Sequence, residues 1–127
     1  MPKKYLYEYA VIRVVPKVER EEFINVGVIL FSKEANYIRS IYKLNETRFK
    51  CFTTELDSKE VEENLHAFDR ICTGSDDGGK IAKLEVAERF RWLTAVRSTA
   101  IQTSRPHSGF SSDLDKTLHR LFDELVL

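Results

Sequence analysis

Aromatic and β-branched side chains dominate residues 5–15, and the run is closed by Pro16, which cannot donate a hydrogen bond to a sheet ladder. Its side chains alternate with the period of two that is typical of a β-strand. One face carries Tyr5, Tyr7, Tyr9 and Val11, and the other carries Leu6, Ala10, Ile12 and Val14. Because both faces are largely apolar, we expect this strand to lie in the middle of a sheet.

Two further strands are predicted after the charged residues 19–22. Residues 23–31 form an almost continuous apolar run, residues 32–36 supply turn chemistry, and residues 37–44 are again apolar and aromatic. The last two strands are therefore expected to form a hairpin. Asn25 and Gly27 interrupt the apolar run at alternate positions, where a glycine marks a bulge, a close approach by another group, or simply tight packing.

Three helices are predicted. Residues 57–60 have the spacing of a capping box, and apolar residues then recur at helical intervals up to Gly74. A second, shorter apolar stripe runs through residues 81–93, and a third follows Ser112, which can cap its first turn. The three stripes are Val61, Leu65, Phe68 and Cys72; Leu84, Ala87, Phe90 and Leu93; and Leu114, Leu118, Leu121, Phe122 and Leu125.

Strand character in residues 99–104 completes the order β-β-β-α-α-β-α. Three consecutive strands without crossover helices favour an antiparallel arrangement. The pattern therefore predicts an α+β fold, with an antiparallel sheet of about four strands and three helices packed mainly on one face. A length of 127 residues fits one such domain over residues 1–127.

Charge and apolar content narrow the function classes. The chain has 20 basic and 20 acidic residues, so no net field attracts a polyanion, and nonspecific nucleic-acid binding is not expected. No stretch approaches the roughly 20 apolar residues that span a bilayer. The first residues lack the apolar region of a secretory signal. These features predict a cytoplasmic protein without membrane contact.

Metal, cofactor and nucleotide motifs are lacking. Cys51 and Cys72 each lie among apolar residues and form no Cys-x-x-Cys pair, so we expect two buried, inert thiols and no metal site. Residues 74–80 match the spacing of a phosphate-binding loop up to Lys80. A helix leads into them, however, Ile81 follows where Ser or Thr would hold the metal, and two aspartates would repel phosphate. We therefore expect a solvated loop between helices and no cofactor.

Residues 97–109 form the most polar segment, with Ala100 and Ile101 as its only apolar members. Between Lys83 and His107 there are five fixed cations against two anions. Guanidinium groups and hydroxyls near a helix N-terminus suit phosphate or carboxylate, with Arg97, Arg105 and His107 as contacts. In the alternative interpretation the hydroxyls bond to nearby backbone and the arginines pair with an acidic helix face.

Arg13 lies inside an otherwise apolar strand, so it must find a partner or reach the edge of the sheet. Glu8 lies on the opposite face of the strand and cannot be that partner. If Arg13 and Asn25 project from neighbouring strands onto one face, they can share a pocket with the polar segment. The sequence alone does not determine that register.

Three blocks of the sequence, residues 9–16, 19–31 and 88–104, together resemble the bacterial domain-of-unknown-function 3037 family over nearly the whole chain. That family has no established activity. Its members are encoded beside HipA-like kinases of the toxin–antitoxin type, so the resemblance implies a partner or regulatory role. The matching motif positions are Arg13, Asn25, Gly27, Arg97, Ser98, Thr99, Gln102 and Ser104.

The leading hypothesis is a noncatalytic binding module that recognises a protein, such as a HipA-like kinase, or an anionic group such as phosphate. Its expected binding residues are Arg13, Asn25, Arg97, Ser98, Thr99, Gln102, Ser104, Arg105 and His107. The alternative is a small enzyme acting on a phosphorylated or nucleic-acid substrate, with Arg97 and Arg105 as clamps and His107 as general acid or base. A third hypothesis, RNA stacking on Tyr5, Tyr7 and Tyr9, requires these rings to be exposed.

Overall fold

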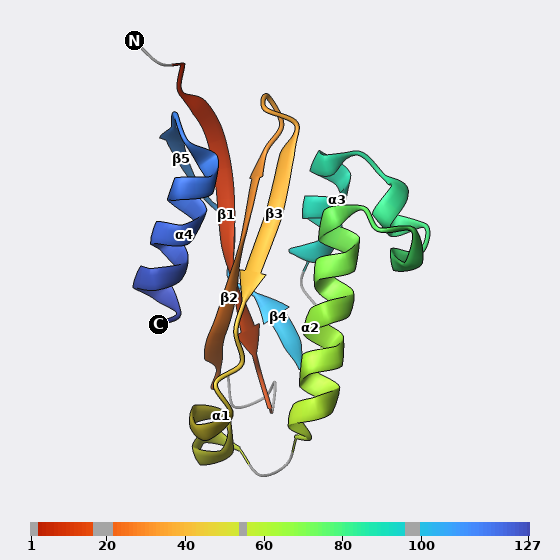
Figure 1. The fold of residues 1–127 in the computed structure, drawn as a ribbon, viewed down its shortest axis with the longest axis vertical. Coiled ribbons are helices and arrows are strands. Elements are labelled where there is room, and N and C mark those ends of the chain that lie inside the picture. The colour runs from red at the N-terminus through yellow and green to blue at the C-terminus, as the bar shows by residue number, and fades with distance from the viewer. Residues whose placement is uncertain (1–2, 17–21, 54–55, 96–99) are drawn as a thin grey trace.

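A computed structural model describes residues 3–16, 22–53, 56–95 and 100–127 of the chain (Figure 1). Its strands are β1 (Tyr5–Val14), β2 (Ile24–Ser32), β3 (Tyr37–Tyr42), β4 (Ile101–Thr103) and β5 (His107–Ser111). Its α-helices are α1 (Glu46–Phe52), α2 (Ser58–Thr73), α3 (Val86–Leu93) and α4 (Leu114–Leu125). Two short 3₁₀ turns, Asp76–Gly78 and Ile81–Lys83, join α2 to α3.

β1 lies inside the sheet, as its two apolar faces predict. One edge of β1 pairs with β2, which pairs in turn with β3, and all of these pairings are antiparallel. The other edge is shared, because β4 pairs with the end of β1 and β5 pairs with its beginning. The predicted α+β class with an antiparallel sheet is confirmed, and β5 adds a strand to the predicted order.

Helices cover both faces of the sheet (Figure 1). On one face α2 and α3 enclose a core that includes Ile12, Ile29 and Leu65. On the other face α4 packs against Val28, Leu30 and the Tyr7 ring. The sequence predicted helices mainly on one face; α2 and α3 do share a face, and α4 occupies the opposite one. The tyrosine-bearing face of β1 is apolar as well, so burying it requires a helix of its own.

Gly27 lies at an irregularity in the pairing of β1 with β2. The register shifts between Ile12, which pairs with Gly27, and Arg13, which pairs with Asn25. A Cβ atom on Gly27 would lie 2.6 Å from the carbonyl oxygen of Ile41, so no larger residue fits without movement. Both a bulge and a close approach therefore account for this glycine.

The helix ends follow local sequence signals. Asp57 caps α2 by accepting a hydrogen bond from the Lys59 amide, and Gly74 ends it with φ +74°, in the left-handed region. Both ends are as predicted, and residues 74–80 form the expected loop between helices. The cap of α4 is Asp113 rather than Ser112, because the Asp113 carboxylate accepts from the Lys116 amide at 3.1 Å. The unpredicted α1 is capped by Asn45 in the same way.

The two cysteines differ in environment. Cys72 is buried as predicted, and burial raises the pKa of its thiol to about 12. Cys51 lies exposed on α1, so the prediction of a buried thiol is wrong there. Its apolar neighbour Phe49 is the residue of α1 that turns inward.

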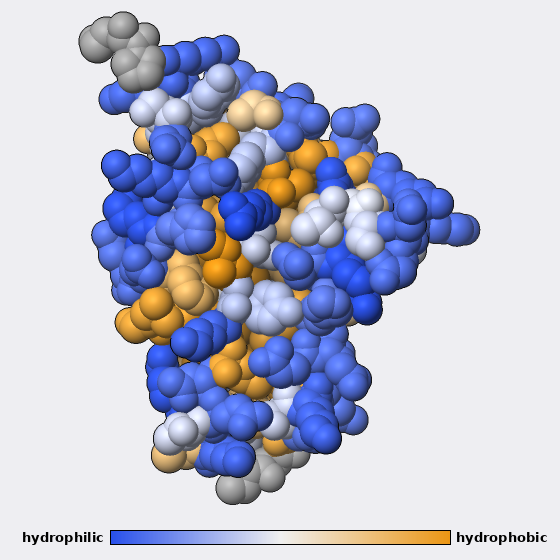
Figure 2. Space-filling view, viewed as in Figure 1, coloured by the Kyte–Doolittle hydropathy of each residue, from blue (hydrophilic) through white to orange (hydrophobic). Residues whose placement is uncertain are grey.

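Charged and polar side chains dominate the face shown in Figure 2, and apolar residues show through between the two helical layers. Among the described residues, no helix combines the length and apolar character needed to cross a bilayer.

Candidate functional site

Three of the predicted binding residues lie in one row across the sheet. Arg13 of β1 pairs with Asn25 of β2 on one side and with Gln102 of β4 on the other. Residues paired in this way project onto the same face. We call Asn25, Arg13 and Gln102 the polar row. It lies on the α4 side of the sheet, since Asn25 bonds to α4.

The Arg13 guanidinium carbon lies 3.9 Å from the centre of the Phe23 ring, an arrangement suited to cation–π attraction. The Arg13 Nε atom is buried and has no hydrogen-bond partner. Burial lowers the pKa of Arg13, which remains a cation at any ordinary pH. The positive charge thus rests on an aromatic surface.

No acidic side chain among the described residues neutralises Arg13. The described ion pairs join Lys3 to Glu34, Arg39 to Asp115 and Arg120 to Glu124, all at other places in the fold. A partly buried cation without a counter-ion is costly, and a bound anion would offset that cost.

Asn25 holds the end of α4. Its Nδ2 atom donates to the Leu125 carbonyl oxygen at 3.1 Å, which satisfies one of the last carbonyls of the helix. Its Oδ1 atom is buried and has no hydrogen-bond partner. The same is true of the Nε atom of the neighbouring Arg13. The row therefore contains one unused acceptor beside one unused donor, which a hydroxyl group or a water molecule can join.

A cavity of about 500 Å³ opens beside Asn25, between the start of β2 and α1. Thr47 and Arg48 of α1 supply its polar groups, and Phe23 supplies part of its apolar wall. The Arg48 Nη1 atom donates to the Val126 carbonyl oxygen at 3.1 Å, so this guanidinium is fixed at the end of α4. Sequence reasoning missed Arg48; the cap pattern of Asn45 followed by Glu46 was the available signal for α1.

Ser104, in contrast, has a structural position. It lies between β4 and β5 and is buried. Its hydroxyl accepts a hydrogen bond from the Val11 amide at 2.9 Å, and its own amide donates to the Val11 carbonyl oxygen at 2.8 Å. Between β4 and β5, the Ser104 hydroxyl thus serves the Val11 amide as the acceptor that a backbone carbonyl would supply in a continuous strand.

Arg105 and His107 are exposed at the start of β5. The His107 ring lies 5.3 Å from that of Tyr9, its partner in register. Tyr9 and Arg13 are four residues apart on one face of β1, which separates them by roughly 13 Å. His107 therefore flanks the polar row at a distance. Arg97, Ser98 and Thr99 lie outside the described residues.

The alternative hypothesis of a small enzyme requires a group that orients the His107 ring. The described contact of this ring is with Tyr9, and no described carboxylate accepts a hydrogen bond from it. No cluster of three His, Cys, Asp or Glu side chains suited to a metal ion occurs among the described residues.

A family model described as protein of unknown function (DUF3037) matches residues 9–126, nearly the whole chain. The chain belongs to this family. A search of curated proteins found no match, and neither did a search of solved structures.

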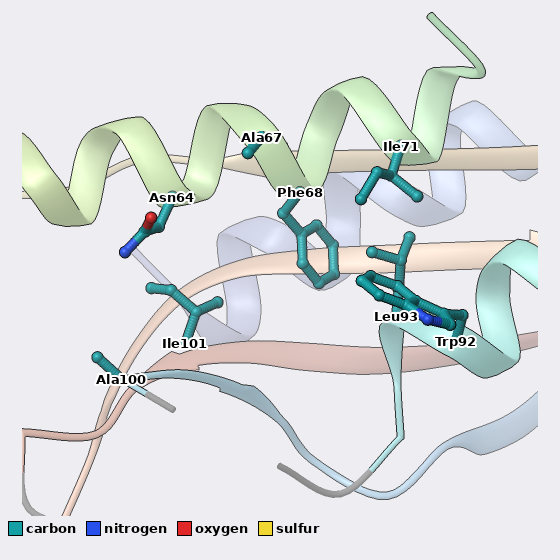
Figure 3. Close-up of a pocket in the computed structure, with 8 residues that line it drawn as sticks. All are labelled: Asn64, Ala67, Phe68, Ile71, Trp92, Leu93, Ala100 and Ile101. Carbon is teal, nitrogen blue, oxygen red and sulfur yellow. The ribbon is translucent and has the colours of Figure 1, made fainter. Parts of the chain in front are cut away.

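A second cavity in this DUF3037 chain, of about 260 Å³, lies on the opposite face between α2, α3 and β4 (Figure 3). The rings of Phe68 and Trp92 line it together with Ile101, and Asn64 supplies the one side-chain amide. None of the described residues that line this cavity is charged.

RNA stacking on the tyrosines of β1 requires exposed rings. Tyr7, at the middle of the three positions, is buried at 7% exposure, and its hydroxyl group packs against Gly109. A continuous stacking platform is therefore not present on β1.

Proposed function

We propose that this protein is a noncatalytic binding module that recognises an anionic group, a phosphate or a carboxylate, presented by a partner protein. The binding position is the polar row, with Arg13 as its charged centre. The observation that carries the proposal is the partly buried Arg13 guanidinium, which has no acidic partner among the described residues.

The chemistry of the row favours an oxyanion. A guanidinium offers paired N–H donors that match two oxygens of one phosphate or carboxylate. Phe23 holds the guanidinium from one side, which reduces the side-chain entropy lost on binding. The unused Asn25 Oδ1 atom can accept a hydrogen bond from a hydroxyl of the ligand, such as a protonated phosphate oxygen.

A partner protein fits this site better than a free small anion. The cavity beside Asn25 adjoins the row and is lined by Phe23 and Phe52 as well as by Arg48, so it can receive apolar and polar groups of one side chain. The HipA-like kinase that the family resemblance implies is the first partner to test, because a kinase presents both phosphorylated residues and acidic loops.

Thermal melting tests the anion part of the proposal. At a phosphate concentration ten times the dissociation constant, binding adds about 1.4 kcal/mol to the free energy of unfolding, or roughly 5 °C in melting temperature. We expect this shift in the wild-type chain and in Arg120→Gln, a surface control, and its loss in Arg13→Gln.

Co-purification tests the partner part. A HipA-like kinase expressed with the wild-type chain is expected to be captured, and Arg13→Gln to reduce the capture. Two results together would contradict the proposal: phosphate, nucleotide and RNA each leave the melting temperature unchanged, and no kinase is captured. An equal phosphate shift in Arg13→Gln would place the anion elsewhere.

A further inference from the structure

The outer edge of β5 is open to pairing. β5 pairs with β1 and with no other described strand. Native edge strands are commonly protected by lysine, proline, inward-pointing charges or a covering element. β5 has the sequence His-Ser-Gly-Phe-Ser, which contains none of these residue types. Pro106 directly precedes it and limits the open edge to the strand itself.

An apolar pair lies on one face at this edge. Phe110 of β5 pairs with Leu6 of β1, on the face opposite to α4. Phe110 is 69% exposed and Leu6 is 51% exposed, and both belong to the short set of large hydrophobic residues that the described surface exposes. Two such neighbours form the centre of an apolar patch, which marks an interaction surface when it lies beside an open strand.

Charged residues of opposite sign flank β5. Arg105 precedes its first residue, His107, and Asp113 follows its end as the exposed cap of α4. An antiparallel copy of the strand reverses this order. It brings Arg105 and His107 of one chain toward the acidic start of α4 in the other, and the reciprocal contact forms at the same time.

We propose that two copies of this chain associate through β5, edge to edge and antiparallel, to form one continuous sheet across a two-fold axis. With the pleats in phase, Phe110 lies opposite Phe110 or Ser108 of the second copy, so the two aromatic rings are direct or diagonal neighbours. The same strand is used by both copies, so the association closes at a dimer. It concerns β5 and is independent of anion binding at Arg13.

The dimer is expected to be weak. Five residues of strand extend over about 17 Å, and this edge with one aromatic pair buries less than the roughly 1,200 Å² typical of stable complexes. A dissociation constant on the order of 100 µM is consistent with such an interface. The zero formal charge of the chain adds no long-range repulsion between copies.

Sedimentation velocity of the full chain, from about 10 µM to about 1 mM, tests this proposal across the expected range. The wild-type chain is expected to convert from monomer to dimer, and Phe110→Lys to remain monomeric throughout. Leu127→Lys is the matched control, because Leu127 is equally exposed at 69% and lies outside β5. It is expected to dimerise like the wild type.

A separate variant tests the proposed contact between Arg105 of one copy and Asp113 of the other. Asp113→Asn keeps the helix cap, since Asn caps as well as Asp, but removes the charge. It is expected to raise the dimer dissociation constant roughly two- to fivefold, whereas Asp123→Asn near the other end of α4 leaves it unchanged. Amide hydrogen exchange gives a second readout: protection that rises with protein concentration in residues 107–111 supports the β5 interface.

A wild-type chain that stays monomeric at about 1 mM overturns the proposal and leaves the β5 edge to a partner of another kind. A dimer that Phe110→Lys does not weaken, or whose added amide protection lies outside β5, overturns it as well. Circular dichroism of each variant separates loss of association from loss of folding.

Discussion

At the residue scale, Ser104 shows how a polar side chain in a candidate binding segment can be required by the fold. Its hydroxyl accepts the Val11 amide inside the protein. Ser104→Ala leaves that amide without a partner, and we expect it to lower the free energy of unfolding by about 1–3 kcal/mol. Chemical denaturation measures this loss. The matched control is Ser108→Ala, an exposed serine of β5, which should change stability by less than about 0.5 kcal/mol.

Equal stabilities for Ser104→Ala and Ser108→Ala would show that the Val11 amide does not depend on Ser104.

The arrangement of the polar row could be predicted from the sequence only in part. Arg13 and Asn25 stand out as polar residues in apolar strands, but their pairing depends on the register shift at Ile12 and Arg13. Sequence patterns indicate that a glycine such as Gly27 marks an irregularity, yet they do not give the direction of the shift.

At the scale of elements, a polar contact joins β3 to the first turn of α4. The Asp115 carboxylate accepts hydrogen bonds from the Tyr37 hydroxyl at 2.5 Å and from Arg39 at 3.0 Å. These two donors lower the pKa of Asp115 below its ordinary value of 3.8. Because the folded pKa is lowered, the contact stabilises the fold fully above that value, and the stabilisation is lost as pH falls through the lowered pKa.

We therefore expect Asp115→Asn to melt at a lower temperature than the wild type at neutral pH. The difference in melting temperature should narrow as the pH falls below 3.8, because the wild-type carboxylate then becomes neutral as well. Asp123→Asn, an exposed carboxylate on the same helix, serves as the control. A difference between wild type and Asp115→Asn that is independent of pH would exclude this charge as the cause.

The long elements were the predictable ones. α2 begins at its capping aspartate and ends at Gly74 because both signals are local. α1 and β5 were missed for different reasons. α1 has only seven residues, too few for a periodic stripe. β5 contains serine and glycine instead of β-branched residues, and it is a strand because β1 offers it a free edge.

At the scale of the whole molecule, one sheet separates two apolar cores, with Leu65 in one and Leu118 in the other. Both leucines are fully buried, so either change to alanine should cost about 2–5 kcal/mol. Because the cores share β1 and β2, we expect a single cooperative transition in both variants. Trp92 fluorescence reports the layer that contains α3. The unfolding transition measured by this fluorescence should then coincide with the one measured by far-ultraviolet circular dichroism, even in Leu118→Ala. A Trp92 transition that Leu118→Ala leaves unshifted would mean that the two layers unfold separately.

The account as a whole depends on Arg13 being a cation that remains available to a partner's anion. The direct measurement is an NMR titration of the isotope-labelled chain with inorganic phosphate, following the Nε–H signals of the arginine side chains. We expect the Arg13 signal to shift and saturate, and the Arg39 signal to stay in place because the Arg39 Nη1 atom already donates to the Asp115 carboxylate. An Arg13 signal that does not move while phosphate shifts signals elsewhere, or shifts none, would contradict the proposed binding site.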